Sequence, residues 1–332
     1  MKIFLTGANG FFGSRLARAL LERTDHELTL LARPGRITNL PLGERVTVAT
    51  GDLANRASLE RALEGCAGVI HAAAHVAAWA RDKSVFDRVN IEGTLNLLQA
   101  AGQAGAEKII YISSFLALGH STGPPLNEED PGEREVHYND YERTKYFANR
   151  RALELAGDQG LPLVVLYPTV LYGPGPLTAG NLIAGMIKDF MRRKLPARLG
   201  DGKPRWNFVF VEDAVRGVLL ALEKAAPGKR YILGGEDVSL AGFFETLEKV
   251  TGVRQPRLAV PFPLARLAGA GEELLAFLFG RMPQTTRAVV DIFTKNWIFD
   301  SSAASRDLGY EALSLEQGLR QTVDWIRSEG LA

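Results

Sequence analysis

The chain has 332 residues, of which 46% are hydrophobic and 23% charged, as in an ordinary globular protein. This composition excludes a disordered chain and a disulfide scaffold, and the length allows about two domains, or one domain with a lobe. The net charge of +1 provides no overall field to attract nucleic acid or an anionic membrane. The single cysteine, Cys66, cannot form an internal bridge, which favours a soluble protein of the cytoplasm.

The first half of the chain alternates short apolar runs with helical patterns. We expect buried strands at residues 2–6, 27–31, 46–50, 69–71, 108–112 and 163–166. We expect helices at residues 11–23, 56–63, 84–104 and 138–155. Because parallel strands are joined by helical crossovers, this alternation predicts an α/β fold with a Rossmann-type, doubly wound parallel sheet.

The alternation stops at a turn cluster of glycine and proline at residues 173–176. We therefore expect the sheet domain to cover residues 1–172 and a smaller α/β substrate lobe to cover residues 173–332. The second part mixes helices with short strands, such as residues 230–233, and some of its strands are expected to return to the main sheet. The sequence shows no repeat and no low-complexity segment.

Residues 264–279 are the most apolar stretch of the second half, but Arg266, Glu272 and Glu273 interrupt them. The run is too short in uncharged residues for an integral membrane span. We expect an amphipathic helix that covers a core or pocket. A role at a membrane surface is the less favoured alternative.

A glycine-rich turn separates the first predicted strand from the first predicted helix, with G-x-x-G-x-x-G spacing at Gly7, Gly10 and Gly13. Glycine lets the backbone approach a pyrophosphate, and the helix N-terminus directs free N–H groups at the phosphates. The alternative is an ordinary glycine-rich turn. The flanking strand and helix favour a dinucleotide site, which includes Phe11 and Phe12.

The end of the second predicted strand indicates which dinucleotide binds. NAD-binding chains place an acid there for the ribose 2′-hydroxyl. This chain has Arg33 and Arg36 and no acid. A guanidinium can hold a 2′-phosphate in a fork, so we predict NADP(H) over NAD(H). The alternative is that Arg33 stacks on adenine or is solvated in a loop.

Tyr141 and Lys145 are spaced i, i+4 on a predicted helix and therefore share a face. A nearby ammonium favours phenolate, so we expect the tyrosine pKa to fall from its usual value of about 10. Such a phenol can exchange a proton during carbonyl–alcohol interconversion. Ser114 follows a predicted strand, where its hydroxyl can bind a substrate oxygen. A surface pair and a serine that caps the strand end are the alternatives.

These motifs occur in the order found in extended short-chain dehydrogenases/reductases. The chain resembles their NAD-dependent epimerase/dehydratase group, and within it the dihydroflavonol-4-reductase-like and hopanoid-associated sugar epimerase-like bacterial members. The motifs that carry the resemblance are residues 6–13, 51–53, 71–74, 113–114, 167–174 and 231–236, with Tyr141 and Lys145.

The resemblance implies roles for individual residues. Ser114, Tyr141 and Lys145 correspond to the catalytic group, and Lys145 also to the ligand of the nicotinamide ribose. The glycine turn corresponds to the pyrophosphate site and Arg33 to the 2′-phosphate contact. Further cofactor contacts are implied for Asp52, Leu53, His71, Ala72, Ala73, Pro168 and Val170. The resemblance also implies a homodimer.

Two departures from the family pattern bear on the substrate. Nucleotide-sugar enzymes of this family commonly carry an asparagine and an arginine where this chain has Val170 and Trp206. Neither replacement can bind a diphosphate, although Arg205 lies one residue away. We expect an apolar or aromatic small-molecule substrate, with Trp79, Phe115 and Trp206 as candidate pocket residues. The alternative for each aromatic residue is a place in the core.

Other chemistries fit less well. Residues 119–123 match G-x-S-x-G, but Pro124 and Pro125 block the helix that a hydrolase elbow requires. His71 and His75 lack a second ligand pair, so no metal site is expected. The leading hypothesis is an NADP(H)-dependent carbonyl reductase or alcohol dehydrogenase. A sugar epimerase or dehydratase with tightly held NAD(P) is the second, and a non-catalytic NADP(H)-binding protein the third.

Overall fold

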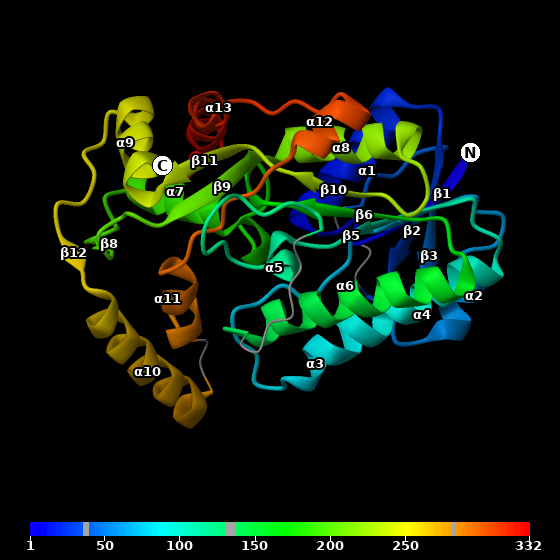
Figure 1. The fold of residues 1–332 in the computed structure, drawn as a ribbon, viewed down its shortest axis with the longest axis horizontal. Coiled ribbons are helices and arrows are strands. Elements are labelled where there is room, and N and C mark those ends of the chain that lie inside the picture. Colours follow the sequence, from blue (N-terminus) through cyan, green and yellow to red (C-terminus); the bar gives the residue numbers. More distant parts are fainter. Residues whose placement is uncertain (36–39, 130–136, 281–282, 284) are drawn as a thin grey trace.

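A seven-stranded parallel sheet forms the centre of the chain, with strand order β10-β6-β5-β4-β1-β2-β3 (Figure 1). The computed structural model describes all residues except 36–39, 130–136, 281–282 and 284. The strands are β1 (Lys2–Thr6), β2 (Glu27–Ala32), β3 (Val46–Thr50), β4 (Gly68–His71), β5 (Lys108–Ile112), β6 (Leu163–Pro168) and β10 (Arg230–Leu233). The predicted Rossmann-type sheet is therefore confirmed.

Helices cover both faces of this sheet (Figure 1). One face carries α1 (Phe11–Arg23), α8 (Val211–Lys224) and α12 (Ser302–Leu308), and the other carries α2 (Arg56–Ala62), α4 (Gly93–Gln103) and α6 (Asp140–Gln159). Successive residues of a strand point to opposite faces. In β1, Phe4 packs into one core, and Ile3 and Leu5 pack into the other. Burial on both sides explains why the strands read as continuous apolar runs.

A smaller set of elements follows β6. Its three-stranded sheet has the order β11-β9-β7, and its two-stranded sheet pairs β12 with β8. The elements are β7 (Val170–Tyr172), β8 (Arg198–Leu199), β9 (Arg205–Phe210), β11 (Glu236–Ser239), β12 (Ala259–Val260), α7 (Leu182–Met191), α9 (Leu240–Thr251), α10 (Phe262–Phe279), α11 (Arg287–Phe293), α13 (Leu315–Ser328) and a short 3-10 helix (Ala179–Asn181). Strand β10 pairs with β6 in the main sheet, and helix α8 packs against the same sheet.

The two long helices on the β4–β6 side differ from their predicted outlines. The helix predicted at residues 84–104 is α3 (Ser84–Phe86), a π-helical segment (Asp87–Glu92) and then α4. Helix α6 begins after Asn139, whose side chain accepts a hydrogen bond from the Glu142 N–H. It ends at Gly160, which adopts the left-handed conformation that suits glycine. The π-helical segment and α6 lie against each other.

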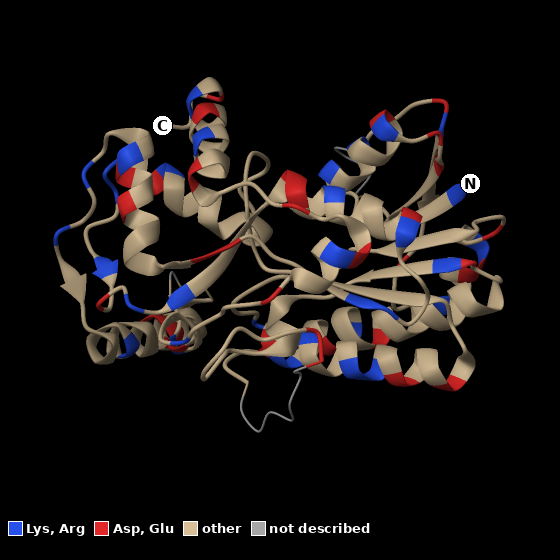
Figure 2. Ribbon diagram, turned by 45° about the horizontal axis from the view of Figure 1, so that its top comes forward, with Lys and Arg blue, Asp and Glu red and all other residues tan. Residues whose placement is uncertain are grey.

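Helix α10 confirms the expected amphipathic helix, but its apolar face points outward. Its buried residues are Ala265, Gly269 and Ala276, and a Cβ at Gly269 would lie 2.9 Å from the backbone nitrogen of Arg287 at the start of α11. Small residues therefore let α10 and α11 pack closely, while the leucines of α10 remain exposed. Figure 2 shows charges of both signs distributed along the chain, and within the described residues no helix is long and apolar enough to cross a bilayer.

Two glycine substitutions should change stability in opposite directions. A Cβ at Gly13 would overlap the Gly7 carbonyl oxygen, whereas a Cβ at Gly157, on the exposed side of α6, meets nothing within 4 Å. We expect Gly13→Ala to lower the free energy of unfolding by about 1–3 kcal/mol. Gly157→Ala should raise it by about 0.5–1 kcal/mol, because alanine favours a helix. Urea denaturation measures both, and a Gly13→Ala protein as stable as the wild type would contradict the packing.

Candidate active site

The glycine turn after β1 packs directly against the chain that leaves β4. Gly7 has a φ of +82°, and a Cβ there would lie 2.7 Å from the backbone of Ala72 and Ala73. The Gly10 N–H donates to the Gly7 carbonyl oxygen at 2.9 Å, which closes the turn. A side chain at Gly7 or Gly13 would force these segments apart. The structure thus brings together two segments that the sequence assigned to one cofactor site.

The first turn of α1 presents its backbone N–H groups at this turn. Gly10 is the N-cap and offers no side-chain acceptor, and the first turn contains no acidic residue. The first helical hydrogen bond runs from the Ser14 N–H to the Gly10 carbonyl oxygen, so the N–H groups of Phe11, Phe12 and Gly13 have no helical acceptor. A close-packed turn beside free N–H groups fits a dinucleotide pyrophosphate.

The predicted adenosine contacts lie at the ends of β2 and β3. Arg33 follows β2 and is exposed. Burial lowers the pKa of His75, and the positive charge of Arg33 lowers it further by a smaller amount. Asp52 follows β3 and accepts a hydrogen bond from the Ala54 N–H at 2.9 Å. Leu53 is buried beside Gly93 of α4. Arg36 lies outside the described residues.

His71 at the end of β4 has a structural role in a directed hydrogen-bond chain. The Thr94 hydroxyl donates to the Asn90 carbonyl oxygen at 2.7 Å, so it accepts from His71 Nε2 at 2.9 Å. The Ala73 N–H donates to Thr6 Oγ1. The Thr6 hydroxyl therefore donates its own proton to His71 Nδ1, and the distance from Oγ1 to Nδ1 is 2.8 Å. Burial, followed by the charge of Lys145, lowers the pKa of His71 to about 3. The ring is therefore neutral and fixes the end of β4 beside the glycine turn.

Ser114, Tyr141 and Lys145 meet at the carboxyl end of β5. Ser114 is the N-cap of α5 (Phe115–Leu118), and its hydroxyl oxygen accepts from the Leu116 N–H at 3.2 Å. Its proton is then free to interact with the Tyr141 oxygen, and Ser114 acts to lower the pKa of that phenol. Lys145 Nζ is buried and donates to the Ile112 carbonyl oxygen at 3.2 Å. The carboxyl ends of parallel strands are the usual place for ligands.

The pKa values of this group differ from the expectation drawn from the sequence. Burial raises the pKa of Tyr141 to about 12, and the hydrogen bond with Ser114 offsets only part of that rise. The predicted lowering of the tyrosine pKa by Lys145 is therefore wrong for this structure. Burial also lowers the pKa of Lys145 to about 7, so its amine is only partly charged at neutral pH. Desolvation sets the direction of both pKa shifts, against the expectation of a pairwise attraction.

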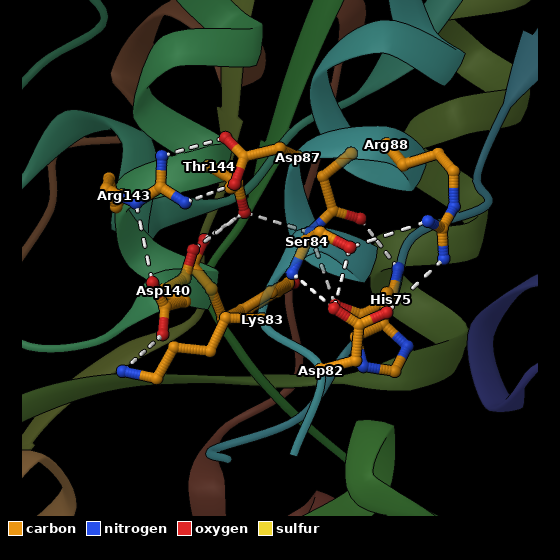
Figure 3. Close-up of polar contacts among 11 residues, drawn as sticks. His75, Asp82, Lys83, Ser84, Asp87, Arg88, Asp140, Arg143 and Thr144 are labelled. Atoms are coloured by element: carbon orange, nitrogen blue, oxygen red, sulfur yellow. Dashed lines mark hydrogen bonds and ion pairs between the residues drawn. The ribbon is translucent and has the colours of Figure 1, made fainter. Parts of the chain in front are cut away.

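A polar network that the sequence did not reveal holds α6 against the π-helical segment (Figure 3). Arg143, between the tyrosine and the lysine, forms two hydrogen bonds with Asp87, at 2.9 and 2.6 Å. The arginine lowers the pKa of Asp87 through this pairing. The buried amide of Asn90 donates to Thr144 Oγ1 at 3.0 Å and to the His75 carbonyl oxygen at 3.2 Å. Asn90 thereby ties α6 to the segment that follows β4.

The three candidate pocket aromatics lie in different surroundings. Trp79 lines a cavity of about 350 Å³ between the start of α6 and helices α10 and α11. Phe115 is partly buried, with its ring centre 5.4 Å from that of Trp297. Trp206 belongs to the core, where its ring lies 4.5 Å from Phe293 and its Nε1–H donates to the Lys295 carbonyl oxygen. The structure therefore corrects the expectation for Trp206 in favour of the core alternative.

The remaining predicted cofactor contacts, Pro168 and Val170, lie where the chain passes from the main sheet to the smaller sheet. Pro168 ends β6, and Val170 begins β7 and is buried. Between them, the Thr169 hydroxyl donates to Asn207 Oδ1 of β9 at 2.7 Å. The described residues contain no cluster of histidine, cysteine or acidic side chains that could hold a metal ion.

The parallel sheet, the glycine turn and the Ser-Tyr-Lys group match the arrangement of a dinucleotide-dependent enzyme. Comparison with known families agrees, because the NAD dependent epimerase/dehydratase family matches residues 3–234. The chain belongs to this family of extended short-chain dehydrogenases/reductases.

Relatives with different substrates cover the whole chain. A Synechocystis protein provisionally named dihydroflavonol 4-reductase is 33% identical, with 98% of this chain and 95% of that protein covered. Sterol demethylase protein B of Methylococcus capsulatus is 31% identical, with both chains covered completely. The structure of UDP-glucuronic acid 4-epimerase from Bacillus cereus in complex with NAD is 26% identical, covers 99% of each chain and gives a TM-score of 0.77.

Burial of Lys145 should make stability depend on pH. The pKa of this amine is about 7 in the folded protein, against the ordinary lysine value of 10.5 that applies to the unfolded chain. Between these values the unfolded chain binds more protons, so this residue makes stability rise with pH. We expect the free energy of unfolding of the wild type, relative to Lys145→Met, to increase from pH 7 toward pH 10.5. Urea denaturation at several pH values measures it, and a pH-independent difference would contradict the burial of the amine.

Proposed function

We propose that this protein is an NADP(H)-dependent oxidoreductase that interconverts a carbonyl and an alcohol on an apolar or aromatic small molecule. The observation that carries the proposal is the convergence of Ser114 and Tyr141, where Ser114 acts to lower the pKa of the tyrosine, beside the buried amine of Lys145. This group lies at the same edge of the sheet as the glycine turn and the free N–H groups of α1. NADPH, when bound, supplies the hydride.

Side chains of the protein then bind the substrate oxygen and supply its proton. The hydroxyls of Ser114 and Tyr141 bind the substrate oxygen and stabilise the negative charge that grows on it during reduction. The Tyr141 phenol, with a pKa of about 12, holds its proton at neutral pH and gives it to that oxygen. A protonated Lys145 stabilises the resulting phenolate. In the direction of alcohol oxidation, the same groups act in reverse.

Aromatic side chains near the site support an apolar substrate, although the cavity that contains Trp79 is also lined by six charged residues. Trp79 and Ala78 line the cavity beside the start of α6, and Phe115 directly follows Ser114. Val170 is buried, as is Trp206, so neither position offers a charged group for a diphosphate. The relatives include proteins named for reduction of a flavonoid and demethylation of a sterol, both of which are largely apolar compounds.

Replacing the tyrosine tests its assigned role. Tyr141→Phe removes the proton donor, so we expect kcat for carbonyl reduction to fall by at least about 100-fold while the Kd for NADPH changes little. The matched control is Tyr146→Phe, a buried tyrosine of the same helix outside the proposed catalytic group. Turnover is followed by NADPH absorbance on a panel of aldehydes and ketones. Full activity of Tyr141→Phe on a substrate that the wild type reduces would refute the assignment.

Replacing Arg33 tests the cofactor preference. We expect Arg33→Asp to weaken NADPH binding by about 10- to 100-fold, because a charge-assisted contact to the 2′-phosphate is lost and a carboxylate repels it. Binding of NADH should change far less. Arg18→Asp on the exposed face of α1 makes the same change in net charge and serves as the control. Calorimetry measures both cofactors, and a wild type that binds NADH more tightly would overturn the preference.

A second candidate function is epimerisation or dehydration of a sugar or nucleotide sugar, with a tightly held NAD(P). The similarity to UDP-glucuronic acid 4-epimerase favours it. Such an enzyme oxidises and re-reduces its substrate on one cofactor molecule, so the nucleotide would co-purify and added NADPH would not be consumed. Analysis of the purified protein shows whether a nucleotide co-purifies, and the turnover screen shows whether added NADPH is consumed. Homodimerisation and a cytoplasmic location stay predictions from the resemblance and composition.

A further inference from the structure

Helix α10 carries a continuous apolar face that no other described element covers. We name its exposed leucines the leucine stripe, namely Leu264, Leu267, Leu274, Leu275 and Leu278. Their spacing places them on one side of the helix, where the intervening positions are Ala268 and Gly271. Leu267 is 71% exposed, and at the end of the helix Phe277 is 80% exposed. A soluble helix normally turns such a face toward its core.

Two of the three charged residues of α10 pair with residues in α11 and are directed away from the leucine stripe. Arg266 pairs with Asp291 of α11 at 3.1 Å, and Glu273 pairs with Arg287 at 2.8 Å. Arg266 and Glu273 also line the cavity that contains Trp79. The inner side of α10 thus lines this cavity, and the side that carries the leucine stripe is exposed.

Exposed cations lie in the two segments that lead into β8 and β12. We name them the basic rim, namely Arg192, Arg193, Lys194, Arg254 and Arg257. The pairing of β8 with β12 brings their two segments together, with the Arg198 N–H donating to the Leu258 carbonyl oxygen at 3.0 Å. None of the five cations has an ion-pair partner in the part of the chain that the structure describes. The end of β12 leads directly into α10.

We propose that the leucine stripe and the basic rim attach this protein peripherally to an anionic lipid bilayer. An exposed apolar helix face inserts at the boundary of headgroups and acyl chains, and lysine and arginine beside it bind anionic headgroups. The positive charge of the basic rim complements anionic lipid headgroups, and this favours a bilayer over other binding partners. A second copy of the chain would cover the leucines but would bring another positive rim to the same contact. The proposal does not depend on the proposed reaction.

Vesicle flotation with the full-length protein tests the attachment. We expect binding to phosphatidylcholine vesicles that contain about 30% phosphatidylglycerol to exceed binding to pure phosphatidylcholine by about tenfold, and to weaken with added salt. Leu267→Gln/Leu274→Gln removes apolar area without changing charge and should reduce binding by at least about tenfold. Arg254→Gln/Arg257→Gln should abolish most of the preference for the anionic vesicles.

The control is Leu42→Gln, which replaces a leucine that is 75% exposed in the segment between β2 and β3. It should bind vesicles like the wild type. All variants alter exposed side chains, so unchanged thermal midpoints and NADPH binding verify folding. Failure of the wild type to float with anionic vesicles would overturn the proposal, as would equal binding by the Leu267→Gln/Leu274→Gln protein. A wild-type dimer that dissociates in that variant, without vesicle binding, would assign the stripe to a second copy instead.

Discussion

The hydrogen bond from Lys145 Nζ to the Ile112 carbonyl oxygen joins the proposed acid–base group to the central sheet. Ile112 ends β5, and Ser114 follows two residues later as the N-cap of α5. The contact therefore sets the position of the lysine relative to the serine and, through one turn of α6, relative to Tyr141. Because the amine is buried, its charge is costly, and that cost keeps its pKa near neutrality.

Helix α6 needs a precise position for this contact, and two polar links provide it. Arg143 binds Asp87 through both of its terminal nitrogens, and Asn90 binds Thr144. Both partners belong to the π-helical segment before α4. Such segments are rare and occur frequently at functional sites. The neutral His71 completes the link from this segment, through Thr94, to the strand end beside the glycine turn.

Much of the fold followed from local patterns in the sequence. The alternation of apolar runs with helical spacing predicted the sheet, and the i, i+4 spacing predicted that Tyr141 and Lys145 share one face of α6. The roles of Asn90 and Arg143 were not predictable in this way, because their partners lie more than fifty residues away along the chain. The same limit explains Trp206, whose neighbours Phe293 and Lys295 come from a distant segment.

Three other differences have a common physical origin. The spacing of the leucines in α10 defined a face of the helix, but periodicity does not say whether that face meets a core or solvent. Likewise, the lysine beside Tyr141 indicated attraction, but the depth of burial decides whether attraction or desolvation controls the pKa. A net charge of +1 also averages over the surface and concealed the basic rim. In each case the missing quantity is the three-dimensional environment.

Titration of the Tyr141 phenol tests the central claim most directly. Tyrosine labelled with ¹³C at Cζ reports the charge of each phenol by NMR, and the Tyr141→Phe protein identifies the signal. Without nucleotide, the phenol should titrate near pH 12. On addition of NADP⁺ its pKa should fall, because the cationic nicotinamide and a protonated Lys145 favour phenolate. A phenol that titrates near its ordinary pKa of about 10, unaffected by nucleotide or by Lys145→Met, would contradict the account.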